Sequence, residues 1–286
     1  GEVVSADSMQ IYRGMDIGTA KPTAEEMGGV PHHMIDVADP WEDFSVARYV
    51  EMAAACVDGI LARGKLPIVA GGTGLYVDSL LSGRTFAAFS PESPLRKELE
   101  RELEEKGGEA MLAELAQVDP EAAARLHPND HKRVVRALEV YRSTGKTITE
   151  HNRETQNLPP RYDALTIGLN FRDRADLWER IDRRVDQMAE AGLEQEVRGL
   201  LSSGLSPACT AMQAIGYKEF TAAVEGTMTW REAEELVKLR SRQYAKRQLT
   251  WFRRNQETRW LLWDKNPDFG NARRRSTEFL REFGVG

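Results

Sequence analysis

Short apolar runs alternate with longer amphipathic stretches along most of the chain. Short apolar runs bounded by turn residues are typical of strands, and longer stretches with helical periodicity are typical of helices. Five segments fit the strand pattern: Glu2–Ala6, His32–Val37, Leu66–Ala70, Ala164–Leu169 and Arg259–Trp263. Because helical stretches separate several of these runs, the pattern predicts an α/β fold.

Three helices outside the middle of the chain have clear end signals. Ser45 can cap the first of them and Gly64 can end it. Its apolar residues have the spacing of one helix face: Val46, Tyr49, Val50, Ala53, Val57 and Ile60. Asp173 can cap a second helix that runs through Ala191 and closes at Gly192. A capping box of Thr229 and Glu232 begins a third, long helix that reaches about Arg254.

The strand pattern disappears between Pro91 and about Gly145, where the chain is helical and highly charged. The predicted helices there are Leu95–Lys106, Glu109–Gln117, Pro120–Leu126 and Asp130–Ser143. A helical block that interrupts an alternating pattern indicates an inserted subdomain. We therefore predict a core of residues 1–90 and 146–286 that carries a helical insertion at residues 91–145.

Composition indicates a globular protein and argues against some classes of function. Of the 286 residues, 41% are hydrophobic and 29% are charged, and no apolar run approaches the ~18 residues of a membrane span. Cys56 and Cys209 have no close partner and no metal-ligand spacing, which indicates a reduced, cytoplasmic protein. The net charge of −6 argues against nonspecific coating of nucleic acid, although a local basic patch is compatible with it.

The first candidate for chemistry is the segment Asp7–Pro22, which follows directly on the first predicted strand. In open parallel sheets, ligands bind at the carboxyl ends of strands, so Asp7 stands where a catalytic carboxylate is useful. Gly14, Gly18 and Lys21 add turns and a polar donor, which favours a ligand loop. The simpler alternative is that Asp7 or Ser8 only caps a following helix.

The second candidate is the Gly71–Tyr76 segment, which follows the strand at Leu66–Ala70. Glycines at a strand end let the backbone approach a ligand closely, and helix-start amides with the Thr73 hydroxyl suit an anion. A tight strand-to-helix turn without a ligand explains the same residues equally well.

Basic residues gather in the long C-terminal helix, with no acidic residue between the first and the last of them. They are Lys238, Arg240, Arg242, Lys246, Arg247, Arg253 and Arg254, with Tyr244, Trp251 and Phe252 interleaved. This pattern favours contact with a phosphate backbone and stacking on bases. The alternative is a solvated helix face whose aromatic residues belong to the core. A smaller basic cluster surrounds His127 and His131, but Pro128 interrupts their helical spacing, so we predict no metal site there.

Together these segments resemble the tRNA dimethylallyltransferase (tRNA isopentenyltransferase) family over nearly the whole chain. Asp7–Pro22 is similar to the family signature Asp-Ser-x-x-x-Tyr-x-Gly-Met-Asp-Ile-Gly-Thr-Ala-Lys-Pro. The supporting matches are His32, Gly71-Gly72-Thr73, His127-Pro128-Asn129-Asp130, Arg136-Ala137-Leu138-Glu139, Ile215-Gly216-Tyr217 and the run Ala245–Arg253.

The resemblance implies a P-loop NTPase-like parallel sheet core with an inserted helical subdomain. It also implies that Asp7 is the general base on the adenine amino group, that Thr73 lies at the reaction channel, and that Arg184 binds diphosphate. The residues that it implies in tRNA binding are Asp7, Ser8, Met9, Gln10, Arg96, Lys132, Arg133, Val134, Val135, Arg136, Gln213, Ala214, Ile215, Gly216, Tyr217 and Lys218. To these we add Lys246 and Arg247 from the basic helix.

The implied reaction transfers a dimethylallyl group from dimethylallyl diphosphate to N6 of an adenine in the tRNA anticodon loop, position 37. The implied cofactor is Mg²⁺, and we expect a cytoplasmic monomer of bacterial type with no membrane partner. In the family, a Gly-x-x-x-x-Gly-Lys-Ser/Thr loop cradles the diphosphate and its hydroxyl holds the metal. That loop would precede Gly1, so we expect little activity from residues 1–286 alone.

Three other functions are compatible with parts of this pattern. A prenyltransferase acting on free adenylate shares the chemistry but has less use for the basic segments. A P-loop small-molecule kinase fits the fold but not the Asp7–Pro22 signature. A non-catalytic RNA-binding module fits the basic segments alone.

Overall fold

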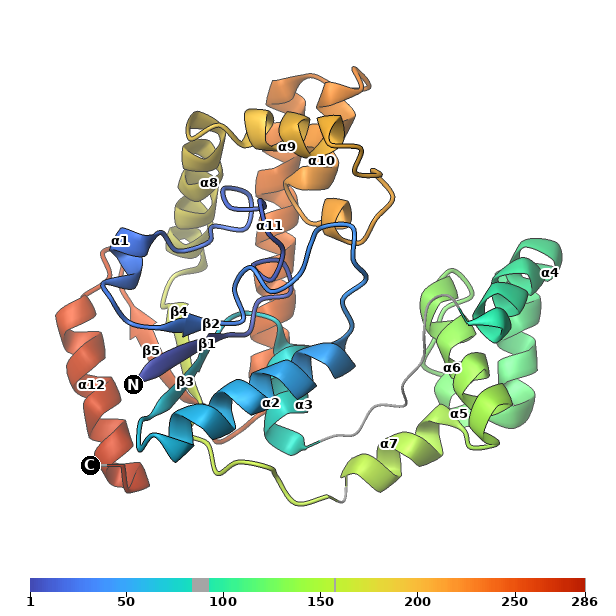
Figure 1. The fold of residues 1–286 in the computed structure, drawn as a ribbon, viewed down its shortest axis with the longest axis horizontal. Helices are drawn as coiled ribbons and strands as arrows, with labels where there is room; N and C mark the ends of the chain where they lie inside the picture. Colours follow the sequence, from blue (N-terminus) through green and yellow to red (C-terminus); the bar gives the residue numbers. More distant parts are fainter. Residues whose placement is uncertain (84–92, 157, 286) are drawn as a thin grey trace. The chain divides into compact units, whose positions relative to one another are not determined.

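The computed structural model describes residues 1–83, 93–156 and 158–285, which form two compact units. Unit 1 combines Gly1–Asp78 with Asp163–Gly286, and unit 2 is Ser79–Tyr162 (Figure 1). Each unit has its own hydrophobic core. The strands all belong to unit 1, and unit 2 is helical in the residues that the structure describes.

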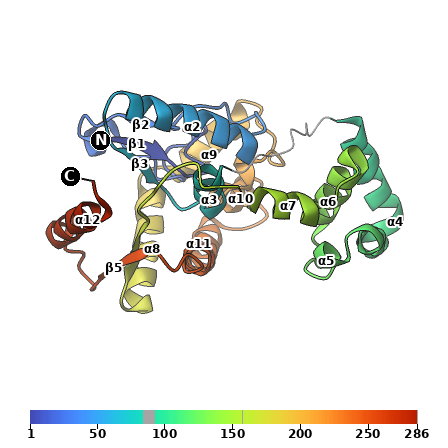
Figure 2. The same cartoon turned by 90° about the horizontal axis from the view of Figure 1, so that it is seen from below.

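A parallel sheet of three short strands organises the first part of unit 1. β1 (Glu2–Ser5) lies between β2 (His32–His33) and β3 (Pro67–Ala70), with Val3 opposite both His32 and Ile68. Because both pairings are parallel, the carboxyl ends of β1 and β3 meet at one edge. Helix α2 (Val46–Ala62) contacts β1 and β3, and Figure 2 shows it lying along this sheet.

The predicted strand His32–Val37 is wrong over most of its length, since only two residues pair with β1. Met34 and Asp36 have φ values of 63° and 56°, which belong to the left-handed region and cannot continue a strand. The predicted helix at Val46–Ile60 is confirmed. The Ser45 side chain accepts a hydrogen bond from the Arg48 amide at its start.

A second parallel pair is formed by β4 (Ile167–Phe171) and β5 (Arg259–Trp263), with Ile167 opposite Arg259. β5 confirms the sequence prediction, whereas β4 lies slightly further along the chain than Ala164–Leu169. The described strands pair as two separate small sheets, which supports a mixed α/β fold with parallel strands.

Unit 1 contains further helices. They are α1 (Ala24–Met27), α8 (Arg174–Glu190), α9 (Leu193–Ser202), α10 (Tyr217–Val224), α11 (Trp230–Phe252) and α12 (Phe269–Phe283), with a short 3₁₀ helix at Ala211–Gln213. Of these, α8 contacts β4 and α12 contacts β5. The predicted caps are confirmed at Asp173, which accepts from the Ala175 amide, and at Thr229, which forms a capping box with Glu232. Helix α3 (Gly74–Ser82) follows β3 directly.

The core of unit 1 contains apolar residues of the Asp7–Pro22 segment. Ile11, Tyr12 and Met15 are almost fully buried, in one cluster with Leu193 of α9 and Tyr217 of α10. A Cβ atom on Gly18 would lie 2.5 Å from the Tyr217 ring. This part of the signature therefore requires its apolar side chains and its glycine for packing.

Besides the last residues of α3, unit 2 contains α4 (Pro94–Val118), α5 (Pro120–Ala123), α6 (His131–Thr144) and α7 (Ile148–Gln156). α4 contains a break at Gly107 (φ 80°), so its two parts agree with the two helices predicted there. The unit extends beyond residues 91–145 because α7 packs on α5 and α6. Asp119 joins these helices, since its carboxylate accepts hydrogen bonds from the Ala122 amide and from the Thr149 amide and hydroxyl.

No helix among the described residues combines the length and the apolar character needed to cross a bilayer.

Candidate active site

The two strand ends predicted to carry chemistry lie side by side. The Ala6 amide donates to the Ala70 carbonyl at 2.8 Å, and the Thr73 amide donates to the Ala6 carbonyl at 3.1 Å. A Cβ atom on Gly71 would lie 2.4 Å from the Ala6 backbone, so this approach requires glycine. The Ser8 amide then donates to Thr73 Oγ1 at 3.0 Å. The Asp7 turn and the Gly71–Thr73 turn therefore form one polar edge.

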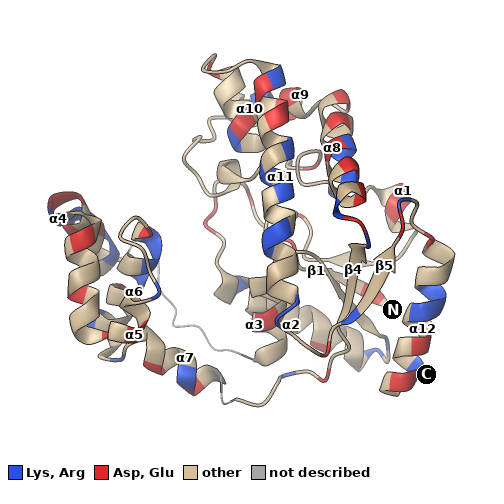
Figure 3. Ribbon diagram, turned by 180° about the vertical axis from the view of Figure 1, so that it is seen from behind, with Lys and Arg blue, Asp and Glu red and all other residues tan. Residues whose placement is uncertain are grey.

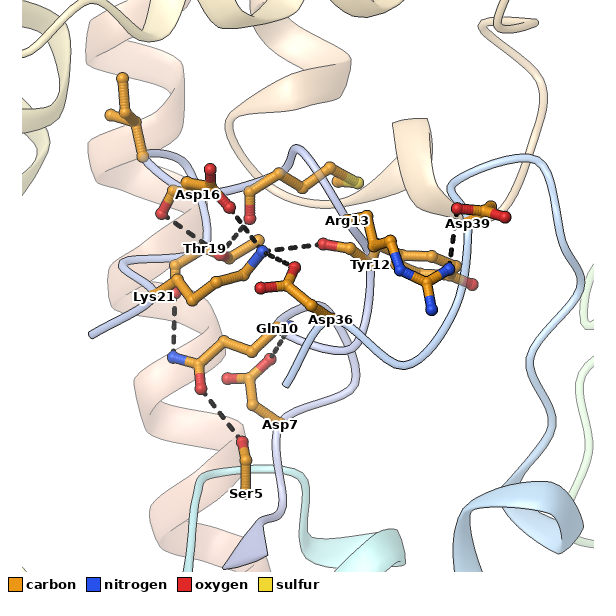
Figure 4. A network of polar contacts seen from close by, with 12 residues as sticks. Ser5, Asp7, Gln10, Tyr12, Arg13, Asp16, Thr19, Lys21, Asp36 and Asp39 are labelled. Carbon is orange, nitrogen blue, oxygen red and sulfur yellow. Dashed lines mark hydrogen bonds and ion pairs between the residues drawn. The ribbon is translucent and has the colours of Figure 1, made fainter. Parts of the chain in front are cut away.

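The Asp7 side chain closes a short turn instead of capping a helix. Its Oδ1 accepts hydrogen bonds from the Met9 amide (2.8 Å) and the Gln10 amide (3.3 Å), as Figure 4 shows in part. Among the described residues, no hydrogen bond reaches Oδ2. The carboxylate is only partly buried, so one of its oxygens is fixed by the backbone and the other can accept a proton from a ligand.

Helix α11 contributes two side chains that the sequence did not assign to this edge. Gln248 Nε2 donates to the Gly72 carbonyl at 2.9 Å, and the Tyr244 side chain hydrogen-bonds to the side chains of Thr73 and Gln248. Burial, together with the charge on Asp7, raises the pKa of Tyr244, so its hydroxyl is a neutral donor and acceptor. Tyr244 and Gln248 are four residues apart and so share one face of α11, but only the packing of α11 shows that this face reaches the Gly71–Thr73 turn.

Arg184 of α8 lies within electrostatic range of Asp7. Surrounding protein atoms lower the pKa of its guanidinium, and the Asp7 carboxylate is the first of the charges that oppose this shift. The nearby Arg180 guanidinium lowers the pKa further. Arg184 is nevertheless an exposed residue, so its guanidinium remains accessible to an anion. The structure therefore brings the three predicted catalytic residues, Asp7, Thr73 and Arg184, into one region of unit 1.

The basic character of α11 is partly neutralised by acids on other helices. Lys238 pairs with Asp186 of α8 at 2.5 Å, and Arg242 pairs with Asp182 of α8, also at 2.5 Å. Arg240 pairs with a buried glutamate of α10. Figure 3 shows the acidic positions on α8 and α10 near the basic positions of α11. These three residues of the predicted phosphate-binding helix therefore already have acidic partners on neighbouring helices.

The later turns of α11 keep their exposed cations. A cavity of about 460 Å³ is lined by Gln243, Lys246, Arg247, Thr250, Trp251 and Arg254. The Arg254 guanidinium lies 3.9 Å from the centre of the Trp251 ring, in a cation–π contact. This α11 groove, defined by these six residues, combines cationic groups with an aromatic side chain.

The tRNA-binding residues predicted in unit 2 divide by burial. Lys132 and Arg133 are exposed on α6, whereas the Val134 and Val135 side chains lie in the core of the unit. Arg136 hydrogen-bonds to Glu139 at 2.9 Å. Arg96 of α4 pairs with Glu100 at 2.7 Å and with Glu139 at 3.5 Å. The structure therefore gives the two valines a packing role and leaves Lys132 and Arg133 exposed, with Arg133 paired to Asp130 at 3.3 Å.

The predicted segment Gln213–Lys218 also divides by burial. Gln213 and Lys218 are exposed at its ends, whereas Ala214, Gly216 and Tyr217 are buried and Ile215 packs against the core of unit 1. Gly216 has a φ of 99°, a conformation that favours glycine. The Tyr217 hydroxyl donates to Glu196 of α9 at 2.5 Å.

The implied Mg²⁺ can be tested against the donor groups of the described residues. These residues contain no group of three or more His, Cys, Asp or Glu side chains placed to hold a metal ion. Mg²⁺ bound with phosphates often uses only one or two carboxylates, and Asp7 is the one carboxylate described at this edge. Since one Asp7 oxygen is already used by two amides, the donors described here do not make a metal site, and we derive no step through one.

Comparisons with known proteins agree with one another. The model of the IPP transferase family matches residues 10–255. A tRNA dimethylallyltransferase of Acetivibrio thermocellus is 46% identical over 285 residues, which covers 100% of this chain and 91% of the relative. A tRNA dimethylallyltransferase of Symbiobacterium thermophilum is 50% identical over 277 residues, covering 97% and 85%.

Solved structures similar to this chain include the full-length tRNA isopentenylpyrophosphate transferase of Bacillus halodurans. It is 43% identical, with a TM-score of 0.72, and the match covers 99% of this chain and 88% of that one. A eukaryotic dimethylallyltransferase acting on tRNA is 31% identical, with a TM-score of 0.81 and coverage of 99% and 73%.

Proposed function

The chain belongs to the IPP transferase family, and from that premise we propose that it transfers a dimethylallyl group from dimethylallyl diphosphate to N6 of an adenine in tRNA. The observation that carries this proposal for the chain's own residues is the Asp7 carboxylate. One of its oxygens is fixed by the backbone and the other has no hydrogen bond among the described residues. The Asp7 charge also acts on Arg184 and on Tyr244. Arg184 is a cation that can bind the leaving group.

Asp7 acts as the general base in this proposal. The N6 lone pair of adenine is delocalised into the ring and is a poor nucleophile. As the new carbon–nitrogen bond forms, Asp7 Oδ2 takes the N6 proton, a contribution of about 10²–10⁴ in rate. The allylic carbon–oxygen bond breaks at the same centre, and its electron pair leaves with diphosphate.

Arg184 binds the departing diphosphate. Its guanidinium is always charged, and its partly exposed position can receive an anion. Negative charge grows on the bridging oxygen in the transition state, and a preorganised cation stabilises it there. Repulsion from Arg180 adds to the preference of this region for an anion.

Thr73, Tyr244 and Gln248 keep the base in place. Thr73 Oγ1 accepts from the Ser8 amide at 3.0 Å, so the β3 turn holds the backbone beside Asp7. The hydrogen bonds of Tyr244 and Gln248 join α11 to the same turn. The backbone turn that orients the Asp7 carboxylate is therefore fixed to its neighbours while a base enters.

Exposed cations bind the tRNA backbone. Lys246 and Arg247 of the α11 groove, with Lys132 and Arg133 of unit 2, are exposed, and each can contact a phosphate. The adenine leaves its stack to reach Asp7, which costs less in a loop such as the anticodon loop. We include in the proposal a P-loop NTPase-like core with a tRNA-binding helical insertion, dependence on Mg²⁺, and a monomer that works in the cytoplasm.

The experiment uses protein expressed from its complete reading frame, incubated with dimethylallyl diphosphate, Mg²⁺ and unmodified tRNA. The tRNA is digested, and N6-dimethylallyladenosine is measured by mass spectrometry. We expect this product from tRNA and none from AMP. Modified AMP beside unmodified tRNA would assign the substrate to free nucleotides. Absence of product from both would contradict the proposal.

A further inference from the structure

The loop after Asp7 is held by several polar contacts that the proposed mechanism does not use. Lys21 Nζ donates to the Tyr12 carbonyl at 2.9 Å and pairs with Asp16 (2.5 Å) and Asp36 (2.6 Å), as Figure 4 shows. The Lys21 side chain is only 6% exposed. The nearly buried Lys21 ammonium therefore holds together the two ends of the loop from residue 12 to residue 21.

Glu196 of α9 binds this loop from the other side. Its Oε2 accepts from the amides of Asp16 (2.9 Å) and Ile17 (2.8 Å), and its Oε1 accepts from the Gly18 amide (3.2 Å). Successive amides that converge in this way form an anion-binding concavity, and the chain fills it with its own carboxylate. The Tyr217 hydroxyl gives Oε1 a second donor at 2.5 Å. Both oxygens of Glu196 are thus engaged, which excludes it as a proton acceptor for substrate.

The residues that follow the bound amides lead to the general base. The carbonyls of Thr19 and Ala20 accept from Gln10 Nε2 at 3.3 and 3.2 Å. The other end of the same amide, Gln10 Oε1, accepts from the Ser5 hydroxyl at 3.0 Å. The Gln10 backbone amide donates to Asp7 Oδ1 at 3.3 Å. Gln10 therefore bonds to the loop through its side chain and to Asp7 through its backbone (Figure 4).

We infer that Glu196 is a positioning residue for the transferase reaction, which rests on the proposed function. It fixes the amides of residues 16–18, so the neighbouring carbonyls stay where Gln10 can bind them, and Gln10 in turn fixes the turn that orients Asp7. The inference also connects the Asp7–Pro22 segment with the Ile215-Gly216-Tyr217 motif. The Gly18 amide and the Tyr217 hydroxyl meet on the same Glu196 oxygen.

The test is Glu196→Gln in protein from the complete reading frame. The amide keeps the size of the side chain but presents an NH₂ group, or a weaker acceptor, to the three backbone donors. A displacement of about 1 Å in a catalytic group can lower the rate by about 10²-fold. We therefore expect kcat at saturating tRNA to fall about 10- to 100-fold, with the tRNA Kd within about twofold of wild type. Glu194→Gln, on the same helix and paired only with Arg198 among the described residues, is the control and should keep wild-type kcat.

A double-mutant cycle separates positioning from general stabilisation. If Glu196 acts through Gln10, then Gln10→Ala combined with Glu196→Gln lowers kcat by much less than the product of the two single losses. Losses that multiply would overturn the inference, as would a folded Glu196→Gln with wild-type kcat.

Folding and the proposed function are controlled separately. Circular dichroism at the assay temperature reports whether each variant is folded. If Glu196→Gln is unfolded, Glu196→Asp replaces it, because this variant keeps the charge and withdraws it from the amides by one methylene. A kcat loss of tenfold or more in Glu196→Asp supports the inference, and wild-type kcat overturns it. Wild-type protein that modifies no tRNA contradicts the proposed function itself.

Discussion

Replacing Lys21 with Met removes an ammonium group from the interior of the signature loop while keeping most of the side-chain volume. In the native structure Lys21 Nζ contacts the Tyr12 carbonyl, Asp16 and Asp36. The two carboxylates are 60% and 47% exposed, whereas Tyr12 is 1% exposed. The carboxylates regain water in the variant, but the Tyr12 carbonyl loses its buried donor.

The expected loss of stability follows from these exposures. Each exposed ion pair contributes about 0–1 kcal/mol. Leaving a buried carbonyl without a donor costs about 1–3 kcal/mol. We expect Lys21→Met to lower the free energy of unfolding by about 2 kcal/mol, which corresponds to a fall in Tm of about 4–8 °C at about 2–4 °C per kcal/mol.

Thermal unfolding followed by circular dichroism measures this change. The matched control is Arg13→Met, in the same loop, which removes an ion pair with Asp39 whose side chains are 53% and 37% exposed. We expect the control to lower Tm by less than about 4 °C, since an exposed pair contributes at most about 1 kcal/mol. Equal losses in the two variants, or no loss in Lys21→Met, would refute the assignment of a buried structural role to Lys21.

Three further predictions concern pH, packing and charge. Hydrogen bonds, first from Arg142, lower the pKa of Glu102 from 4.5 to about 2, so the unfolded chain binds this proton more readily than the folded one. Its stabilising effect is present above pH 4.5 and is lost as pH falls toward 2, and the Tm difference between wild type and Glu102→Gln should vanish over that range. Gly74→Ala places a Cβ 2.3 Å from the Trp251 ring and should lower the free energy of unfolding by about 1–3 kcal/mol in urea denaturation; an unchanged midpoint would contradict this packing. Lys246→Gln should reduce the slope of log Kd for tRNA against log salt by about 1, whereas Arg242→Gln, already paired, should leave it unchanged; equal slopes for the two variants would contradict the division of α11.

Periodicity and end signals predict the elements that local sequence determines. The Ser45 and Thr229 caps lie where they were predicted, since a capping hydroxyl and its amide are only three residues apart. The strand at His32–Val37 was predicted too long because positive φ at Met34 and Asp36 has no signature in hydrophobicity. Backbone conformation of that kind is set by the contacts of the folded chain.

The candidate site likewise contains residues that the sequence predicts and residues that only the packing of the helices reveals. Asp7 and Thr73 could be predicted because both follow strands, and the carboxyl ends of parallel strands meet. The contribution of Tyr244 depends on how α11 packs, and that of Glu196 on how α9 packs, neither of which follows from spacing. The ion pairs that neutralise part of α11 join residues on different helices, such as Arg242 and Asp182, so they were missed for the same reason.

The role of Asp7 is tested most directly by the single-turnover rate of Asp7→Asn at saturating tRNA and dimethylallyl diphosphate, beside the tRNA Kd of the same variant. Asn keeps the shape and can accept the two backbone hydrogen bonds, but it cannot take a proton from N6. We expect the rate to fall about 10²–10⁴-fold while the tRNA Kd stays close to wild type. A wild-type rate, or a loss that vanishes once tRNA is saturating, would contradict the assignment of Asp7 as the general base.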